Sequence, residues 1–230
     1  MYKRILTAVT VIVLLCLPTA WAADTSATAA ILMDGDTGEV LYEKNPDRQM
    51  LIASTTKLMT TLVVLERGGL GDVVTVTQQH IAEGSSMYLK PGDRVTVEEL
   101  LYGLLLCSGN DAALALADHC GGLERFVAEM NRKAAELGMK NTHFTDCCGL
   151  TDSEDHYTTP RDIALMSQEL ITKYPEVFDY TKIWMENITH VTAKGSSEFG
   201  LTNTNKLIRQ YEYATGLKTG STSLAKYCVS

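Results

Sequence analysis

The sequence predicts an α/β protein of the α+β type, with an antiparallel sheet built from both chain ends and a mainly helical subdomain inserted between them. Two observations favour this class. Short apolar runs bounded by turn residues occur near both ends, whereas apolar residues at helical period, closed by glycines, fill the middle. We place the sheet parts at about residues 24–70 and 185–230 and the helical part at about residues 71–184.

The N-terminal part of the sheet is predicted by a hairpin pattern. Residues 29–33 are apolar, residues 34–38 read Asp-Gly-Asp-Thr-Gly, and apolar residues return at 40–42, as in two strands joined by a turn. Apolar positions then recur at helical period over residues 54–67, and the glycine pair that follows would end this helix.

The middle of the chain carries the other predicted helices. Thr159 and Pro160 are residue types preferred at the N-cap and the first helical position, so we expect a helix from there to residue 171. Further helices are expected at residues 97–106, 111–119 and 123–137, and short strands at residues 73–76, 87–89, 186–192, 216–219 and 225–229.

The N-terminus has the three-part layout of a secretory signal peptide. Lys3 and Arg4 precede an apolar run at residues 5–17, and small residues at positions 20 and 22 suit a cleavage site. The run is shorter than the roughly 20 residues that span a bilayer, so a retained membrane anchor is the less favoured alternative. We therefore expect residues 1–23 to be a signal peptide and the protein to be exported.

Charge and cysteine content exclude some classes of partner. The formal net charge is −8, which argues against nucleic acid. The chain has six cysteines, and those beyond the predicted signal peptide have no metal-ligand spacing, so neither a metal nor another cofactor is predicted. These thiols are expected to be small buried groups: Cys107, Cys120, Cys147, Cys148 and Cys228.

Three short motifs occur in a fixed order: Ser54-Thr55-Thr56-Lys57, Ser108-Gly109-Asn110 and Lys218-Thr219-Gly220. Each alone is weak, since Ser223-Leu224-Ala225-Lys226 also fits the first pattern by chance. Residues three apart near a helix N-terminus share one face, so Lys57 can reach Ser54 and take its proton. Lysine is a base only when neutral, so we expect burial and the charge of Lys218 to lower the pKa of Lys57.

With these motifs, the segments 30–34, 106–113, 149–150, 156–159 and 216–220 resemble the serine-type D-Ala-D-Ala carboxypeptidases. These are low-molecular-mass penicillin-binding proteins with a β-lactamase/transpeptidase-like fold, and the resemblance runs from about residue 29 to the last residue. It implies removal of the terminal D-alanine from peptidoglycan stem peptides ending in D-Ala-D-Ala, through an acyl-enzyme on Ser54. It also implies β-lactams as covalent inhibitors and a location in the cell-wall space or periplasm.

The resemblance also implies roles for the other motif residues. Ser108 would help carry a proton to the leaving amine, and Asn110 would hold the substrate backbone and orient Lys57. Lys218 and Thr219 would bind the terminal carboxylate, and Gly220 would allow close approach of the substrate. The backbone N–H groups of Ser54 and Ser221 would form the oxyanion hole, whereas His156 would be structural.

Two departures from the family pattern stand out. Cys147 and Cys148 replace a polar or proline pair, and the sequence ends at Ser230, where relatives continue with at least one more strand. We therefore expect residues 24–230 to be the catalytic domain without its last strand or strands, with an unpaired edge and marginal stability. Membrane association would depend only on parts not present in this sequence.

Three alternatives stay open. A class A-like β-lactamase shares the motifs but uses a glutamate in an E-x-x-x-N-like loop, and residues 153–160 lack that asparagine. A non-catalytic peptidoglycan-binding remnant would bind without acylation. An endopeptidase or transpeptidase of the same fold is also compatible with the motifs.

Overall fold

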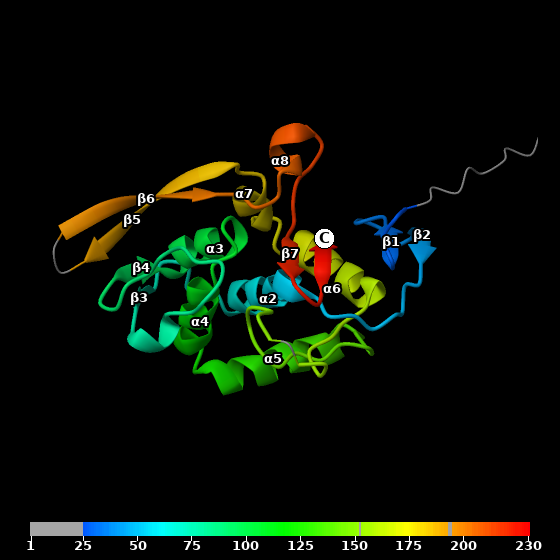
Figure 1. Cartoon of the computed structure of the whole chain (residues 1–230), viewed down its shortest axis with the longest axis horizontal. Coiled ribbons are helices and arrows are strands. Elements are labelled where there is room, and N and C mark those ends of the chain that lie inside the picture. Colours follow the sequence, from blue (N-terminus) through cyan, green and yellow to red (C-terminus); the bar gives the residue numbers. More distant parts are fainter. Residues whose placement is uncertain (1–24, 152, 193–194) are drawn as a thin grey trace, which may run out of the picture.

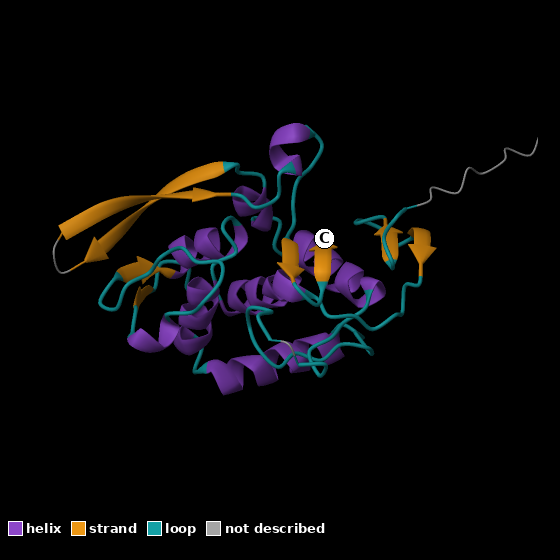
Figure 2. Ribbon diagram, in the orientation of Figure 1, coloured by secondary structure: helices purple, strands orange, loops and turns teal. Residues whose placement is uncertain are grey.

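The computed structural model describes residues 25–151, 153–192 and 195–230, so the predicted signal peptide lies outside the described residues. Figures 1 and 2 show a group of helices with small antiparallel ladders around it. The strands are β1 Ala30–Met33, β2 Val40–Lys44, β3 Val73–Thr75, β4 Arg94–Thr96, β5 Met185–Thr192, β6 Gly195–Thr202, β7 Thr219–Thr222 and β8 Lys226–Val229. The α-helices are α2 Lys57–Arg67, α3 Val97–Leu105, α4 Asn110–His119, α5 Leu123–Glu136, α6 Pro160–Lys173, α7 Val177–Thr181 and α8 Leu207–Gln210, with short 3-10 helices η1 Ala53–Thr56 and η2 Gln78–His80.

Helix α2 lies at the centre of the core. It packs against α3, α4, α5 and α6, and Figure 1 shows it in the middle of the helical group. Leu58, Met59 and Leu62 are each at most 1% exposed, and burying such a side chain stabilises the fold by about 1.5–3 kcal/mol. The apolar period predicted this helix correctly, and the packing fixes its first turn, where Lys57 lies.

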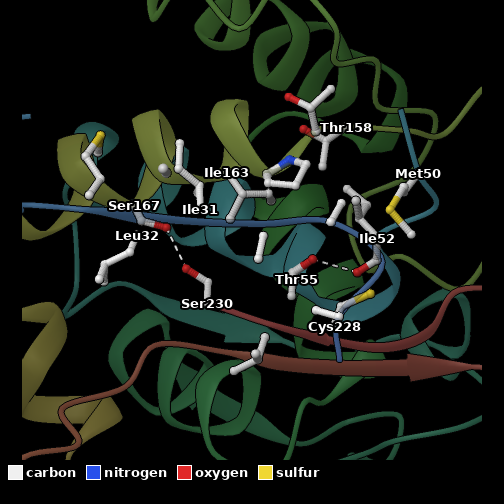
Figure 3. Close-up of a pocket in the computed structure, with 18 of the residues that line it drawn as sticks. Ile31, Leu32, Met50, Ile52, Thr55, Thr158, Ile163, Ser167, Cys228 and Ser230 are labelled. Atoms are coloured by element: carbon white, nitrogen blue, oxygen red, sulfur yellow. Dashed lines mark hydrogen bonds between the residues drawn. The ribbon is translucent and has the colours of Figure 1, made fainter. Parts of the chain in front are cut away.

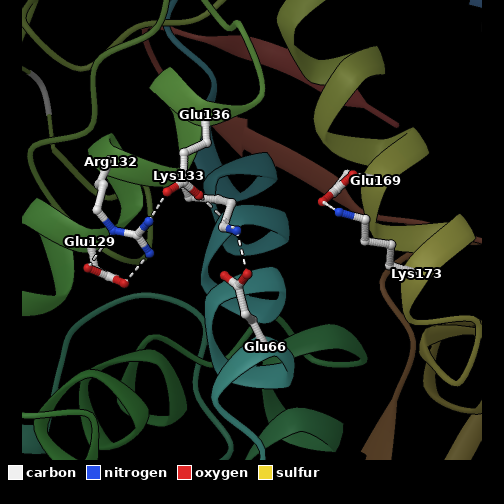
Figure 4. A network of polar contacts seen from close by, with 7 residues as sticks. All are labelled: Glu66, Glu129, Arg132, Lys133, Glu136, Glu169 and Lys173. Atoms are coloured by element: carbon white, nitrogen blue, oxygen red, sulfur yellow. Dashed lines mark hydrogen bonds and ion pairs between the residues drawn. The ribbon is translucent and has the colours of Figure 1, made fainter.

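A polar network joins α2 to α5 (Figure 4). The Lys133 ammonium on α5 pairs with Glu66 at the end of α2 and with Glu136 on its own helix. Arg132 pairs with Glu129 and Glu136, along the exposed side of α5. The exposed Arg132 pairs each contribute little to stability. Of these pairs, only Lys133–Glu66 joins α5 to α2.

The sheet part of the fold consists of antiparallel ladders, as the α+β class predicts. β1 pairs with β2 and β7 pairs with β8, each as a two-stranded ladder. The sequence-based assignment of residues 185–202 to the terminal sheet needs correction, because β5 and β6 pair with each other and join β4 through Arg94 and Val191. Strand β6 was not predicted because Gly195, Ser196, Ser197 and Gly200 give it no apolar alternation.

The two terminal ladders lie on either side of a pocket of about 570 Å³. Its lining comes from β1, α6 and β8, and Figure 3 shows Ile31 and Leu32 on one side and Cys228 and Ser230 on the other. In the described part of the chain, β1 and β8 share no ladder, so the expected single sheet is present as two ladders. Large apolar side chains on the strands of the two ladders are exposed: Leu32, Leu41, Tyr227 and Val229.

Two further segments differ from the prediction. Residues 87–89 are not a strand; the backbone N–H groups of Met87 and Leu89 instead donate to the carboxylate of Asp111, each at 3.0 Å. Strand β7 begins at Thr219 rather than at residue 216. Across the residues that the structure describes, no helix combines the length and apolarity needed to cross a membrane.

Candidate active site

Ser54 and Lys57 lie where η1 runs into α2. The Nζ of Lys57 donates a hydrogen bond of 3.1 Å to the Oγ of Ser54. Lys57 is completely buried, whereas Ser54 is half-buried and so faces an accessible space. Ala53 has a φ of 47°, a left-handed conformation that is costly for alanine and typical of strained functional sites. The two residues predicted as nucleophile and base therefore lie within hydrogen-bond distance of each other.

The Lys57 ammonium has two further acceptors. It donates to Oδ1 of Asn110 at 2.8 Å and to the carbonyl oxygen of Cys148 at 2.7 Å. A lysine ammonium has three N–H donors, so Ser54 and these two groups satisfy all of them. Burial lowers the pKa of Lys57, while the charges of Cys148, Cys147 and Asp146 act in the opposite direction. The lysine is thus fixed in place and moved toward the neutral form that a base requires.

The second motif lies at the start of α4. Asn110 is held by its backbone N–H, which donates to the carbonyl of Ser85, and by its side-chain Nδ2, which donates to the carbonyl of Glu83, both at 2.8 Å. The Oγ of Ser108 is buried and has no hydrogen-bond partner among the described residues. A buried hydroxyl without a partner costs free energy, which marks Ser108 as a group available to a ligand.

The third motif forms the start of β7, which lies against η1. A Cβ added to Gly220 would be 2.8 Å from the backbone N of Ser54, so only glycine allows this close approach. Thr219 and Ser221 lie on the same strand, and Ser221 is exposed. The oxyanion-hole role of the Ser54 and Ser221 N–H groups stays a prediction.

Lys218 is buried beside this strand, with only 1% of it exposed. Its Nζ donates to the carbonyl of Thr219 at 2.9 Å. Burial, and then repulsion from Lys57, lower the pKa of Lys218 to about 7. We expected burial and the charge of Lys218 to lower the pKa of Lys57; burial does so, whereas the repulsion between the two lysines is a cause of the lowered pKa of Lys218.

One supporting segment, residues 145–151, was not predicted to belong to the site. The Asp146 carboxylate accepts hydrogen bonds from the backbone N–H groups of Cys148 at 2.7 Å, Gly149 at 2.5 Å and Thr151 at 3.2 Å. This loop presents the Cys148 carbonyl to Lys57. An aspartate followed by Gly149 is a turn signal that could have located the loop, but its contact with α2 spans 91 residues of sequence.

His156 connects the same loop to η1. Its Nδ1 accepts from the backbone N–H of Thr145 at 3.0 Å, so its Nε2 carries the hydrogen and donates to Thr56 Oγ1 at 2.8 Å. Burial lowers the pKa of His156, which favours this neutral form. These contacts agree with the structural role that we expected.

The fold and the site together define an α+β protein with a half-buried serine beside a buried lysine. A family model described as D-alanyl-D-alanine carboxypeptidase, Peptidase S11, matches residues 18–230, and the chain belongs to this family. The chain is 42% identical over 211 residues to the D-alanyl-D-alanine carboxypeptidase DacF of Bacillus subtilis, covering 89% of this chain and 53% of DacF. It is 37% identical over 231 residues to DacC of Escherichia coli, covering 91% of this chain and 56% of DacC.

A solved relative agrees with this assignment. The crystal structure of the Streptomyces K15 DD-transpeptidase superposes with a TM-score of 0.83 at 36% identity, covering 90% of this chain and 84% of that one. The chain spans about half the length of the Bacillus and Escherichia relatives. The family and the fold class that we inferred from the sequence are thus confirmed.

Proposed function

We propose that this chain is the catalytic part of a serine-type D-Ala-D-Ala carboxypeptidase that removes the terminal D-alanine from peptidoglycan stem peptides. The observation that carries the proposal is the 3.1 Å hydrogen bond between Lys57 Nζ and Ser54 Oγ, in a site where lysine is buried and its pKa lowered. A serine hydroxyl becomes a strong nucleophile only when a neighbouring base takes its proton, and this geometry supplies that base.

Acylation requires that Lys57 is neutral while Lys218 keeps its proton. Because burial lowers the pKa of both Lys57 and Lys218, one proton leaves the pair near neutral pH. A substrate carboxylate beside Lys218 would keep the remaining proton on that residue, which leaves Lys57 neutral. The binding of a carboxylate-terminated peptide would thereby activate the base, and this favours a C-terminal D-alanine as the substrate.

Ser54 Oγ then attacks the carbonyl carbon of the penultimate D-alanine while Lys57 takes the hydroxyl proton. The C–N bond breaks, and the leaving amine receives a proton through the hydroxyl of Ser108, which has no other partner among the described residues. An extended substrate would align along β7, where Gly220 leaves room for its backbone. Water would hydrolyse the ester on Ser54. β-Lactams would acylate the same oxygen.

A direct test is the release of D-alanine from an N-acylated L-Lys-D-Ala-D-Ala peptide. We expect release by the wild type and none by Ser54→Ala. Ser223→Ala is the matched control, because Ser223 begins the chance Ser-x-x-Lys match and is exposed. Equal release by wild type and Ser54→Ala would refute the assignment. Rapid hydrolysis of a chromogenic cephalosporin with no D-alanine release would favour the β-lactamase. The absence of both reactions would favour the non-catalytic peptidoglycan-binding remnant.

Transpeptidation is the second candidate, because the superposed Streptomyces K15 protein is a DD-transpeptidase. Acyl transfer to an amine uses the same acyl-enzyme, so the two activities differ only in what attacks the ester. Adding glycine to the same assay separates them: a transpeptidase yields a glycine-capped peptide, whereas a carboxypeptidase yields the free acid.

We also propose that residues 1–23 direct export, so that the protein acts outside the cytoplasm, where peptidoglycan is found. The layout of basic, apolar and small residues supports this. Expression of the full chain in a bacterial host, followed by N-terminal sequencing of the exported protein, tests it. We expect the mature chain to begin near Ala23 or Asp24, and an uncleaved N-terminus would contradict the proposal.

A further inference from the structure

Two adjacent thiols lie in the loop that holds the catalytic lysine. Cys147 is fully buried and Cys148 is 7% exposed. The interaction between the two thiol groups lowers the pKa of Cys148 and raises that of Cys147, and the nearby Lys57 lowers the pKa of Cys148 further. Thiolates are the reactive form of cysteine, so Cys148 is both the more reachable and the more reactive member of the pair.

The peptide unit between these cysteines is tied to the catalytic helix. The carbonyl of Cys147 accepts a hydrogen bond of 2.6 Å from Thr60 Oγ1, one turn after Lys57 on α2. The N–H of Cys148 donates to Asp146 Oδ1 at 2.7 Å, and the carbonyl of Cys148 accepts from Lys57 Nζ at 2.7 Å. The acceptor of Lys57 therefore lies in the peptide unit directly after the one that joins the two cysteines.

A disulfide between neighbouring residues would rotate the peptide unit between them. Consecutive Cα atoms are about 3.8 Å apart across a trans peptide, whereas disulfides usually join Cα atoms about 4.4–6.8 Å apart. Closing the ring must twist the peptide that carries the Cys147 carbonyl and the Cys148 N–H. The bonds to Thr60 and Asp146 would be lost, and the Cys148 carbonyl would turn away from Lys57.

We propose that Cys147 and Cys148 are an oxidation site whose disulfide withdraws the acceptor that positions Lys57 and so slows acylation of Ser54. Hydrogen peroxide is a sufficient oxidant. The Cys148 sulfur attacks one peroxide oxygen; an S–O bond forms, the O–O bond breaks, and one water leaves. The Cys147 sulfur then attacks the Cys148 sulfur; the S–S bond forms, the S–O bond breaks, and a second water leaves with the thiol proton. The two thiols lose two electrons and peroxide is reduced to water.

The test uses the reduced full chain, treated with hydrogen peroxide and then with catalase. Trypsin would release residues 141–161, which contain Cys147 and Cys148 and no other cysteine. We expect this peptide to become lighter by the mass of two hydrogens. We expect the rate of acylation by benzylpenicillin to fall by about 10- to 100-fold, the scale of a small misplacement of a catalytic group, and to recover with dithiothreitol.

Matched variants separate this pair from the other thiols. Cys147→Ala and Cys148→Ala should lose the sensitivity to peroxide, whereas Cys120→Ala, which removes a buried thiol at the end of α4, should keep it. The acylation rates of the oxidised wild type before and after dithiothreitol can be compared even if a variant fails to fold. Three results would overturn the proposal: a peptide that keeps both thiols, a bridge to Cys107, or a disulfide that leaves the acylation rate unchanged.

The measurement of acylation rests on the proposed function. Failure of the proposed function and failure of the inferred oxidation site can be told apart. If the reduced protein is not acylated at all, the proposed function fails. The mass of residues 141–161 and the melting temperature before and after peroxide then decide the inference. An unchanged peptide refutes it, and a lighter peptide with a lowered, dithiothreitol-reversible melting temperature supports a strained loop disulfide.

Discussion

Lys57 Nζ lies 3.1 Å from Ser54 Oγ although the lysine side chain is completely buried. An unpaired buried ammonium would be strongly destabilising, so its position depends on the acceptors around it and on the ease with which it loses its proton. Asn110 and the Cys148 carbonyl supply the acceptors, and burial lowers the pKa. The fold thus keeps a buried lysine with a lowered pKa beside a serine hydroxyl, as the proposed pair of base and nucleophile requires.

The pH profile of acylation should be bell-shaped. The rate should rise through about pH 7 as the lysine pair loses one proton, since the pKa of Lys218 is about 7 and that of Lys57 is also lowered. It should fall at higher pH when Lys218 can no longer attract a carboxylate. In Lys218→Arg the cation does not titrate, so the falling limb should disappear while the rising limb remains. Rates of benzylpenicillin acylation across pH test this, and an unchanged falling limb would contradict it.

Thermal stability should increase between pH 7 and about pH 8. The folded protein loses one proton from the Lys57–Lys218 pair near pH 7, while the unfolded chain keeps both protons up to about pH 10.5. The unfolded state therefore binds more protons in this window, and stability rises with pH. Above it, ionisation of thiols in the unfolded chain acts in the opposite direction, because burial raises the pKa of Cys107 to about 11 in the fold. In Lys218→Met the melting temperature should depend less steeply on pH than in the wild type. An equal slope in the two proteins would refute this account.

Asn110 should control the pKa of Lys57 as well as its position. In Asn110→Asp the carboxylate beside the ammonium raises the pKa of Lys57, so the rising limb of the pH profile should move to higher pH. Asn110→Ala only removes the acceptor and leaves the Glu83 carbonyl unpaired, so it should reduce the rate about 100-fold without that displacement. Acylation rates measured against pH distinguish them. Identical profiles for the two variants would show that the amide oxygen does not act on Lys57.

Gly149 should be essential for stability and acylation because there is no room for a side chain at this position, rather than because of its backbone conformation. Its φ is 76°, and a Cβ there would lie 1.8 Å from the Ala53 carbonyl oxygen. Gly138 has a φ of 73° and nothing within 4 Å, so Gly138→Ala measures the conformational cost alone, about 1–2 kcal/mol. Gly149→Ala should lose a further ~1–3 kcal/mol in urea denaturation and most of its acylation rate. Equal losses would contradict the packing of this loop on η1.

Three short motifs in a fixed order were enough to select residues that the structure brings together. Ser54, Lys57 and Asn110 are joined by hydrogen bonds through the Lys57 ammonium, and Gly220 lies against the backbone of Ser54. The loop that positions Lys57 was not predicted to belong to the site, because Asp146 and Gly149 signal only a turn and the loop contacts α2 from 91 residues away. The pairing of β5 and β6 with β4 was missed for the same reason: strand partners far apart in sequence depend on packing, not on local propensity.

The central claim, that Ser54 is a nucleophile activated by Lys57, is tested most directly by the intact mass of the protein after incubation with benzylpenicillin. We expect one adduct of one drug mass, mapped to the peptide that contains Ser54, in the wild type and none in Ser54→Ala. The same adduct in Ser54→Ala, or a folded wild type that leaves the drug intact and carries no adduct, would contradict the account.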